Sequence, residues 1–191
     1  MKLGTLKILK WIILFLFLIF CLFICSQSAG AKSISDFRYL ILVDLKNLNL
    51  SLKDLQRGVI IKKYPIAGPR SLKYLEPLPK IGEIGKIEFH PFWYPTPNTR
   101  ESYFKKYGVE LPTVIHPNDP RNAMGTVAMV LKFDGKQSIY RLHGTNEPQS
   151  IGKRASSGCI RMKNEDIEEL ARTIFNFKTK IIIYYEKIPV E

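Results

Sequence analysis

His143 and Cys159 are the two side chains of this sequence whose types and spacing suggest chemistry. They lie sixteen residues apart in the stretch YRLHGTNEPQSIGKRASSGCIRM, and Cys159 is the only cysteine outside the apolar N-terminal run. A thiolate is a strong nucleophile, and a neighbouring imidazole can activate it. The loop between the two residues contains glycine and proline and can fold back. The spacing is therefore compatible with a working Cys–His pair.

The residues around this pair fit the same chemistry. Gly144 allows a sharp backbone turn directly after His143, and a third group should hold the imidazole in the correct tautomer. The small residues Ser157 and Gly158 would expose backbone N–H groups to a developing oxyanion. Arg161 can bind a carboxylate through two parallel hydrogen bonds. Together these residues predict nucleophilic acyl transfer.

Other interpretations of the same residues are weaker or stay open. A zinc site would need further ligands, and His90 and His116 lie in separate proline-rich segments without paired cysteine spacing, so we expect no metal. A serine nucleophile at Ser156 or Ser157 would require a G-x-S-x-G turn, which ASSGC does not supply. An inert buried thiol at Cys159 is also compatible with the sequence, because free cysteine is among the most buried residue types.

Hydrophobic patterning predicts the elements that must position these residues. Apolar runs or alternation indicate strands at residues 37–45, 48–55, 58–68, 84–90, 126–133, 136–144 and 180–186. Asp134 and Gly135 predict a hairpin turn whose second strand ends at His143. Asn164 is predicted to cap a helix with one apolar face, formed by Ile167, Leu170, Ala171 and Ile174. About seven strands and one helix predict a single mostly-β domain of Greek-key, barrel or sandwich form.

Residues 91–125 form a long segment that contains six prolines. We expect it to be irregular, with about one turn of helix near residues 101–107. Loops of this length in a compact domain are usually functional. The aromatic side chains of the segment could line a substrate groove or pack only on one another: Phe92, Trp93, Tyr94, Tyr103, Phe104 and Tyr107.

Residues 1–31 differ in composition from the rest of the chain. Three lysines without an acid precede a fifteen-residue apolar run at residues 11–25, and an A-x-A pattern follows at residues 29–31. This order is typical of a secretory signal peptide. The run is shorter than the ~20 apolar residues of a membrane span, but an uncleaved signal anchor is also compatible. We therefore expect a signal peptide or anchor at residues 1–31 and one exported domain at residues 32–191.

The composition of the chain indicates a folded, basic protein. Of its 191 residues, 46% are hydrophobic and 24% are charged, which is ordinary for a globular domain. The net charge is +12, and +9 remains without the three lysines of the leader. Such a surface favours anionic partners. For an exported protein, anionic wall polymer or lipid headgroups fit better than nucleic acid.

The stretch from His143 to Leu170 resembles the signature of the L,D-transpeptidases, the family with the YkuD-type catalytic domain. In that family a histidine–glycine pair is followed by a spacer of similar length and then by S/T-x-G-C-x-R, which SSGCIR matches at residues 156–161. The segment YLILVDLKNLNLSL is similar to the family's opening hairpin. HPFWYPT is similar to its W-x-P segment, and DPRNAMG to its N-P-L-G turn. The resemblance extends over most of residues 37–186.

The resemblance implies a β-sandwich-like fold with a mixed, largely antiparallel sheet and one main helix after the catalytic cysteine. It implies that Cys159 is the nucleophile, that His143 is the general base, and that the Gly144 carbonyl orients the imidazole. Gly158, Ser156 and Ser157 would form or support the oxyanion hole. The expected substrate-binding residues are Arg161, Trp93, Tyr94, Asn122 and Thr145. The family chemistry requires no metal or organic cofactor.

The resemblance also implies a reaction. Cys159 would attack the L,D amide of a peptidoglycan tetrapeptide stem, release the terminal D-residue and transfer the acyl group to an amine. That amine would belong to another stem in a 3→3 crosslink, to a wall-anchored protein or to a free D-amino acid. The expected location is the periplasm or cell envelope.

Two alternatives stay open. One is an L,D-carboxypeptidase or peptidoglycan amidase with water as the acceptor. The other is a non-catalytic wall-binding module, although the joint presence of His143, Cys159 and Arg161 argues against it.

Overall fold

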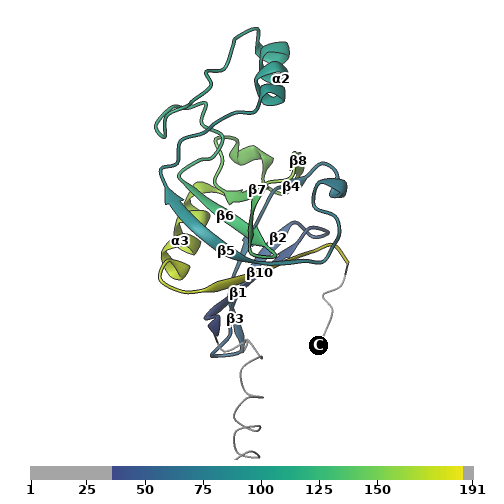
Figure 1. Cartoon of the computed structure of the whole chain (residues 1–191), viewed down its shortest axis with the longest axis vertical. Coiled ribbons are helices and arrows are strands. Elements are labelled where there is room, and N and C mark those ends of the chain that lie inside the picture. Colours follow the sequence, from purple (N-terminus) through teal and green to yellow (C-terminus); the bar gives the residue numbers. More distant parts are fainter. Residues whose placement is uncertain (1–35, 187–191) are drawn as a thin grey trace, which may run out of the picture. The chain divides into compact units, whose positions relative to one another are not determined.

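The computed structural model describes residues 36–186 (Figure 1). The predicted signal segment at residues 1–31 lies outside the described residues. Within residues 36–186, no helix is long and apolar enough to cross a membrane. The elements in chain order are β1 (Tyr39–Asp44), β2 (Asn49–Asp54), β3 (Val59–Pro65), β4 (Gly68–Pro69), β5 (Lys80–Phe89), α2 (Pro97–Tyr107), β6 (Val127–Phe133), β7 (Lys136–His143), β8 (Arg154–Ser156), β9 (Ile160–Arg161), α3 (Asn164–Ile174) and β10 (Thr179–Tyr184).

Eight of these strands form one sheet, in the order β3-β2-β1-β10-β5-β6-β7-β9. The pairs β1–β10 and β7–β9 are parallel, and the other neighbours are antiparallel. Strands β4 and β8 form a separate parallel pair. The prediction of a mostly-β fold with a mixed, largely antiparallel sheet and a main helix after Cys159 is confirmed.

The core lies between the sheet and α3. Along β1 and β10 alternate residues are fully buried, for example Ile41 and Val43 on β1 and Ile181 and Ile183 on β10. This is the period of two that a strand imposes on its side chains. The predicted apolar face of α3 is confirmed, since Ile167, Leu170, Ala171 and Ile174 are all buried. Full burial of each large aliphatic side chain stabilises the fold by about 1.5–3 kcal/mol.

The proline-rich segment contains more helix than the sequence indicated. The single turn predicted near residues 101–107 is instead the eleven-residue helix α2. The Thr96 hydroxyl caps this helix by accepting a hydrogen bond from the Thr99 N–H at 3.2 Å, and Pro97 occupies its first turn. Proline is favoured there because the N–H that it lacks would have no helical partner. Gly108, at a φ of 68°, ends the helix. In Figure 1, α2 stands apart from the sheet.

Three further expectations about the elements were wrong in detail. The N-cap of α3 is Lys163, and Asn164 is already helical, so the Asn164 side chain does not cap the helix. Strand β5 begins at Lys80, four residues before the predicted start. The described part of the chain has ten strands rather than about seven, because β4, β8 and β9 contain only two or three residues each. Segments that short have no measurable hydrophobic period.

The β6–β7 hairpin carries the predicted histidine into place. Asp134 and Gly135 form its turn, as predicted, with φ values of 51° and 74°. Positive φ at both central residues matches the twist of the flanking strands. His143 is the last residue of β7. The parallel neighbour β9 pairs Leu142 with Ile160 and His143 with Arg161, so the end of β7 lies beside the segment that directly follows Cys159.

Candidate active site

The imidazole of His143 is held in one orientation by the adjacent peptide group. Its Nδ1 lies 2.6 Å from the carbonyl oxygen of Gly144. Because a carbonyl can only accept a hydrogen bond, Nδ1 must carry the proton, and Nε2 keeps its lone pair. The backbone is fixed on both sides, since the Gly144 N–H donates to the Val127 carbonyl and the Met162 N–H donates to the His143 carbonyl, each at 2.9 Å. His143 therefore presents Nε2 as a base.

Burial keeps this imidazole neutral. His143 is only 2% exposed, and its pKa is lowered from 6.5 to about 4. Desolvation is the main cause, the positive charge of Arg161 adds to it, and the carbonyls of Gly144 and Ala123 oppose it. A buried cation loses its hydration, so the uncharged form is favoured. At neutral pH His143 can accept a proton.

This pKa predicts a specific loss of stability in acid. In the unfolded chain His143 titrates near 6.5, so the unfolded state binds the proton first as the pH falls. The free energy of unfolding should decrease by up to about 1.4 kcal/mol per pH unit between pH ~6.5 and ~4, through His143 alone. Urea unfolding at several pH values in this window should show a shallower slope for His143→Gln than for wild type. Equal slopes in the two proteins would contradict the buried, neutral state.

Cys159 directly precedes β9, the parallel neighbour of β7. Arg161 of β9 pairs with His143, and Arg141 precedes His143 by two residues on β7. Cys159 is a free, partly exposed cysteine. The charges of Arg141 and Arg161 act on both the His143 imidazole and the Cys159 thiol, so the fold gathers these four groups near the end of β7.

The resting pair is a thiol and a neutral imidazole. Burial raises the pKa of Cys159, while the backbone N–H of Arg141 and the charges of Arg141 and Arg161 lower it by less. Within residues 36–186 no hydrogen bond joins the Cys159 sulfur to the His143 ring. Catalytic hydrogen bonds are often loose in a free enzyme and tighten only with substrate. Proton transfer from Cys159 to His143 would therefore accompany attack rather than precede it.

A tight turn positions Cys159. The Ser156 hydroxyl donates to the Cys159 carbonyl and accepts from the Gly158 N–H at 3.2 Å. Gly158 has a φ of 131°, which L-residues rarely adopt, and a Cβ there would lie 2.2 Å from a ring carbon of Tyr140. Ser156 and Gly158 are buried, and Ser157 is exposed. The Gly158 N–H already has a partner, which leaves the Cys159 N–H as the candidate oxyanion donor.

Gly158→Ala should therefore destabilise the fold by about 3 kcal/mol, because backbone strain and overpacking act together. Gly152→Ala is the matched control. Gly152 also has a positive φ, 81°, but a Cβ there would meet no atom within 4 Å, so about 1 kcal/mol of strain is expected. Urea unfolding of the two variants measures the difference. Equal losses would show that contact with Tyr140 does not constrain the turn.

Two arginines set the charge around the pair. Arg161 donates through Nη1 to the Glu147 carboxylate at 2.8 Å. Its Nε is buried and has no hydrogen-bond partner among the described residues. Arg141 donates through Nη1 to the Ser138 carbonyl and, at 3.0 Å, to the Tyr140 carbonyl. The sequence prediction missed Arg141, although its place two residues before His143 on one strand was a signal.

Two of the predicted substrate-binding residues bond to protein groups. Asn122 is 2% exposed, donates to the carbonyls of Pro91 and His116, and accepts from the Met124 N–H. Thr145 is also 2% exposed, and its hydroxyl accepts from the Glu147 N–H at 3.0 Å. These contacts hold the loops of residues 116–124 and 144–147. A direct contact of either side chain with substrate stays a prediction.

The two predicted aromatic residues lie in different environments. Trp93 pairs through its backbone with Ile115, at 2.9 Å in both directions. Tyr94 is 68% exposed. The idea that the aromatic residues of this segment line a groove next to the nucleophile stays a prediction for both.

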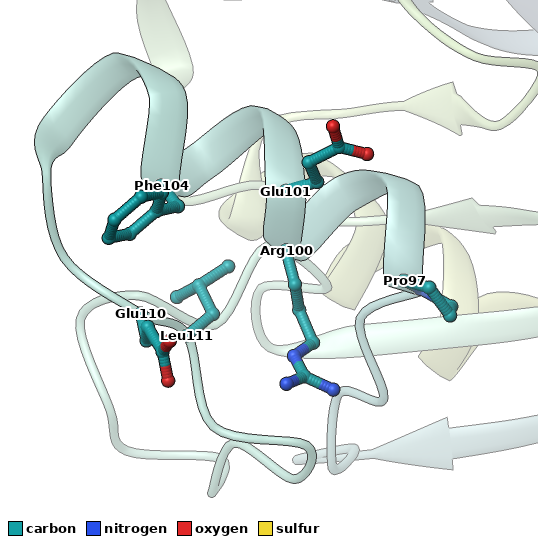
Figure 2. A pocket seen from close by; sticks show the side chains of 6 residues that line it. All are labelled: Pro97, Arg100, Glu101, Phe104, Glu110 and Leu111. Carbon is teal, nitrogen blue, oxygen red and sulfur yellow. The ribbon is translucent and has the colours of Figure 1, made fainter.

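A separate pocket lies beside α2. Its volume is about 290 Å³, and Figure 2 shows the guanidinium of Arg100 and the carboxylate of Glu110 on one side of the helix, with Glu101 turned the other way. Phe104, Leu111 and Pro97 complete the lining. His143 and Cys159 are not among the residues that line this pocket. In the part of the chain that the structure describes, no group of three or more His, Cys, Asp or Glu side chains could hold a metal ion.

Similarity to known proteins identifies the family. The model of the YkuD family, the L,D-transpeptidase catalytic domain, matches residues 38–183. The protein named "Probable L,D-transpeptidase ErfK/SrfK" of Escherichia coli is 46% identical over 80 residues, which are 42% of this chain and 24% of that protein. "Probable L,D-transpeptidase YcfS" of E. coli is 47% identical over 81 residues, with the same coverage. The alignments thus span about a quarter of the length of these relatives.

Solved structures share the fold. Bd1075 of Bdellovibrio bacteriovorus matches with a TM-score of 0.51 and 21% identity, over 84% of this chain and 52% of that chain. L,D-transpeptidase 3 of Mycobacterium tuberculosis also matches with a TM-score of 0.51, at 12% identity, over 77% of this chain and 61% of that chain. Because the family match covers most of the sequence and includes both His143 and Cys159, the chain belongs to the YkuD family of L,D-transpeptidase catalytic domains.

Proposed function

We propose that this protein is a cysteine acyltransferase of the bacterial cell wall that breaks an L,D amide in a peptidoglycan stem peptide. One observation carries the proposal. The His143 imidazole is buried, neutral and held by the Gly144 carbonyl at 2.6 Å, and the charges of Arg141 and Arg161 act on both this ring and the Cys159 thiol. This is the arrangement that a nucleophile, a base and an orienting group require.

Acylation begins with attack of the Cys159 sulfur on the carbonyl carbon of the L,D amide. The thiol proton moves to Nε2 of His143 as the S–C bond forms. The carbonyl oxygen becomes an oxyanion, and the Cys159 N–H is placed to stabilise it. When the C–N bond breaks, the imidazolium gives its proton to the departing amine, so the terminal D-residue leaves as a neutral amine. A thioester remains on Cys159.

Deacylation repeats these steps with an acceptor amine. The neutral imidazole of His143 takes a proton from the amine as its nitrogen attacks the thioester carbonyl carbon. The C–S bond then breaks as the new amide forms, and His143 returns the proton to the departing sulfur. Arg141 and Arg161 favour this cycle because their positive charges lower the pKa of Cys159 and stabilise the sulfur as it becomes negative. Burial opposes the resting thiolate, so the reactive form appears only while His143 holds the proton.

The substrate and location also belong to the proposal. A net charge of +12 suits an anionic polymer such as the cell wall. The leader pattern of residues 1–31 suits export to the envelope. The acceptor is an amine of another stem, of a wall-anchored protein or of a free D-amino acid. Water as acceptor would make the protein an L,D-carboxypeptidase.

The test incubates the full-length protein in detergent with purified disaccharide-tetrapeptide, with and without an isotope-labelled D-amino acid. Wild type is compared with Cys159→Ala, and Gln137→Ala on the exposed part of β7 is the control. Mass spectrometry should find a dimer that lacks one terminal D-residue, or exchange of the labelled residue, in all but the Cys159 variant. Loss of the D-residue without a dimer or exchange would show that water is the acceptor. The protein would then be an L,D-carboxypeptidase and not a transferase. No turnover in folded wild type would refute both.

A further inference from the structure

Asn164, the first residue of α3, connects two loops of the site through one side-chain atom. Its Oδ1 accepts hydrogen bonds from the backbone N–H groups of Thr126, at 3.3 Å, and Thr145, at 3.0 Å. Thr126 directly precedes β6, and Thr145 follows Gly144. The helix does not use this side chain as a cap, because the N-cap is Lys163. The Asn164 amide is therefore committed to tertiary contacts.

The bond to Thr145 reaches the catalytic histidine through a single peptide group. The N–H of Thr145 and the carbonyl of Gly144 belong to the same planar unit. That carbonyl accepts the Nδ1 proton of His143 at 2.6 Å. Asn164, the peptide plane and the imidazole thus form one hydrogen-bonded chain, in which neighbouring bonds polarise one another. Rotation of the plane would weaken both bonds at once.

The packing around Asn164 gives independent support. A Cβ on Gly144 would lie 2.2 Å from the Asn164 Oδ1, and a Cβ on Gly125 would lie 2.1 Å from the same atom. Real Cβ atoms do not approach so closely, so both positions must be glycine for the amide to enter between the loops. Gly125 also has a φ of 65°, which favours glycine. Both loop backbones are shaped around this one oxygen.

The same short segment also carries the nucleophile. Four residues separate Cys159 from Asn164, and among them the Met162 N–H donates to the His143 carbonyl at 2.9 Å. The chain from Cys159 to Asn164 thus contacts the His143 backbone directly and the His143 ring through the 144–145 peptide. Placement of the thiol and orientation of the base are coupled by this segment.

We propose that Asn164 is a positioning residue that fixes the 144–145 peptide plane and thereby holds His143 in the Nδ1-protonated tautomer. Its amide oxygen completes, through the Gly144 carbonyl, the orienting function that a carboxylate performs directly in other triads. The kinetic consequence rests on the proposed acyl transfer. The tautomer of His143 can be measured without any substrate.

Asn164→Leu and Asn164→Asp provide the test. Leucine keeps the approximate volume and removes the acceptor, whereas aspartate keeps both acceptor contacts. Long-range ¹H–¹⁵N NMR of full-length protein labelled at histidine reports which ring nitrogen carries the proton. We expect a mixture of tautomers in Asn164→Leu, together with a fall in kcat of about 10- to 100-fold with little change in KM. Asn164→Asp should keep the wild-type tautomer and remain within about threefold of the wild-type rate, because its acceptor is intact.

Asp44→Leu is the matched control for the loss of a buried acceptor. The Asp44 Oδ1 also accepts from two backbone N–H groups, those of Lys46 at 3.0 Å and Asn47 at 2.9 Å. Three strands separate β1, which carries Asp44, from β7 in the sheet. This variant should lose stability but keep the His143 tautomer and the wild-type rate. A merely structural role for Asn164 would make the two leucine variants behave alike.

Three results would overturn the inference. A folded Asn164→Leu protein with the wild-type tautomer and rate would show that the peptide plane needs no support. A folded Asn164→Asp protein as impaired as Asn164→Leu would show that the acceptor is not what matters. If Asn164→Leu does not fold, the test rests on Asn164→Asp. Its new negative charge polarises the 144–145 peptide and should thereby raise the pKa of His143. An unchanged pKa of His143 would refute the connection between Asn164 and the imidazole. Inactive wild type would refute only the proposed function, because the tautomer is read separately.

Discussion

Cys159→Ser is expected to reduce acyl transfer by about 10⁴-fold or more, although it changes only one atom. A hydroxyl is a far weaker acid than a thiol, and the buried imidazole of His143, with a pKa of about 4, is too weak a base to activate it. Release of the terminal D-residue from a disaccharide-tetrapeptide, measured against time, gives the rate. Thermal unfolding of the variant should match wild type, since the two side chains are nearly isosteric.

Substantial activity in this variant would point to a different chemistry. If Cys159→Ser retained one tenth of the wild-type rate, the attacking group would have to be water or another side chain. The exposed Ser157 would be the first candidate to examine. The family match would stand, but the roles proposed for the pair would not.

His143→Gln should lower the rate by about 10²- to 10⁴-fold and change the form of the pH dependence. In wild type the base is lost as the pH falls through about 4, so kcat/KM should be level above pH ~5 and fall tenfold per unit well below pH ~4. Without the imidazole, attack requires a preformed thiolate. The remaining activity should then rise tenfold per pH unit up to the pKa of Cys159, which burial raises.

The wild-type profile is the more discriminating half of this experiment. If Cys159 and His143 instead formed a thiolate–imidazolium pair, the fall of wild-type kcat/KM in acid would follow protonation of the thiolate. That fall would lie at a pH well below the ordinary pKa of a thiol. The same level profile in His143→Gln and wild type would show that His143 takes no part in proton transfer. Glutamine keeps a hydrogen-bond donor near the Gly144 carbonyl, so a large disturbance of the fold is not expected.

The hairpin that carries His143 could be predicted because local sequence determines it. The Asp134–Gly135 turn and the alternation along β7 fix where His143 falls, whatever the rest of the chain does. The apolar spacing of α3 was equally local. The mixed, largely antiparallel sheet, in contrast, was predicted from the family resemblance and not from local patterning.

Most of the features that were missed depend on tertiary contacts, and helix α2 is the exception. Strands β4, β8 and β9 form only because distant segments pair with them, so their two or three residues carry no pattern. The six prolines of residues 91–125 led to the prediction of an irregular segment, although Thr96 and Pro97 suit the start of a helix. Asn164 looked like a cap because a cap needs only a local N–H, whereas its actual partners, Thr126 and Thr145, come from other parts of the chain.

The measurement that tests the central claim most directly is the intact mass of the protein during turnover. Wild type is mixed with disaccharide-tetrapeptide, quenched in acid within seconds and analysed whole and after proteolysis. We expect a mass increase equal to the substrate without its terminal D-residue, located on the peptide that contains Cys159 and removed when an amine acceptor is added. Release of the D-residue from an enzyme that never carries this adduct would contradict covalent catalysis by Cys159.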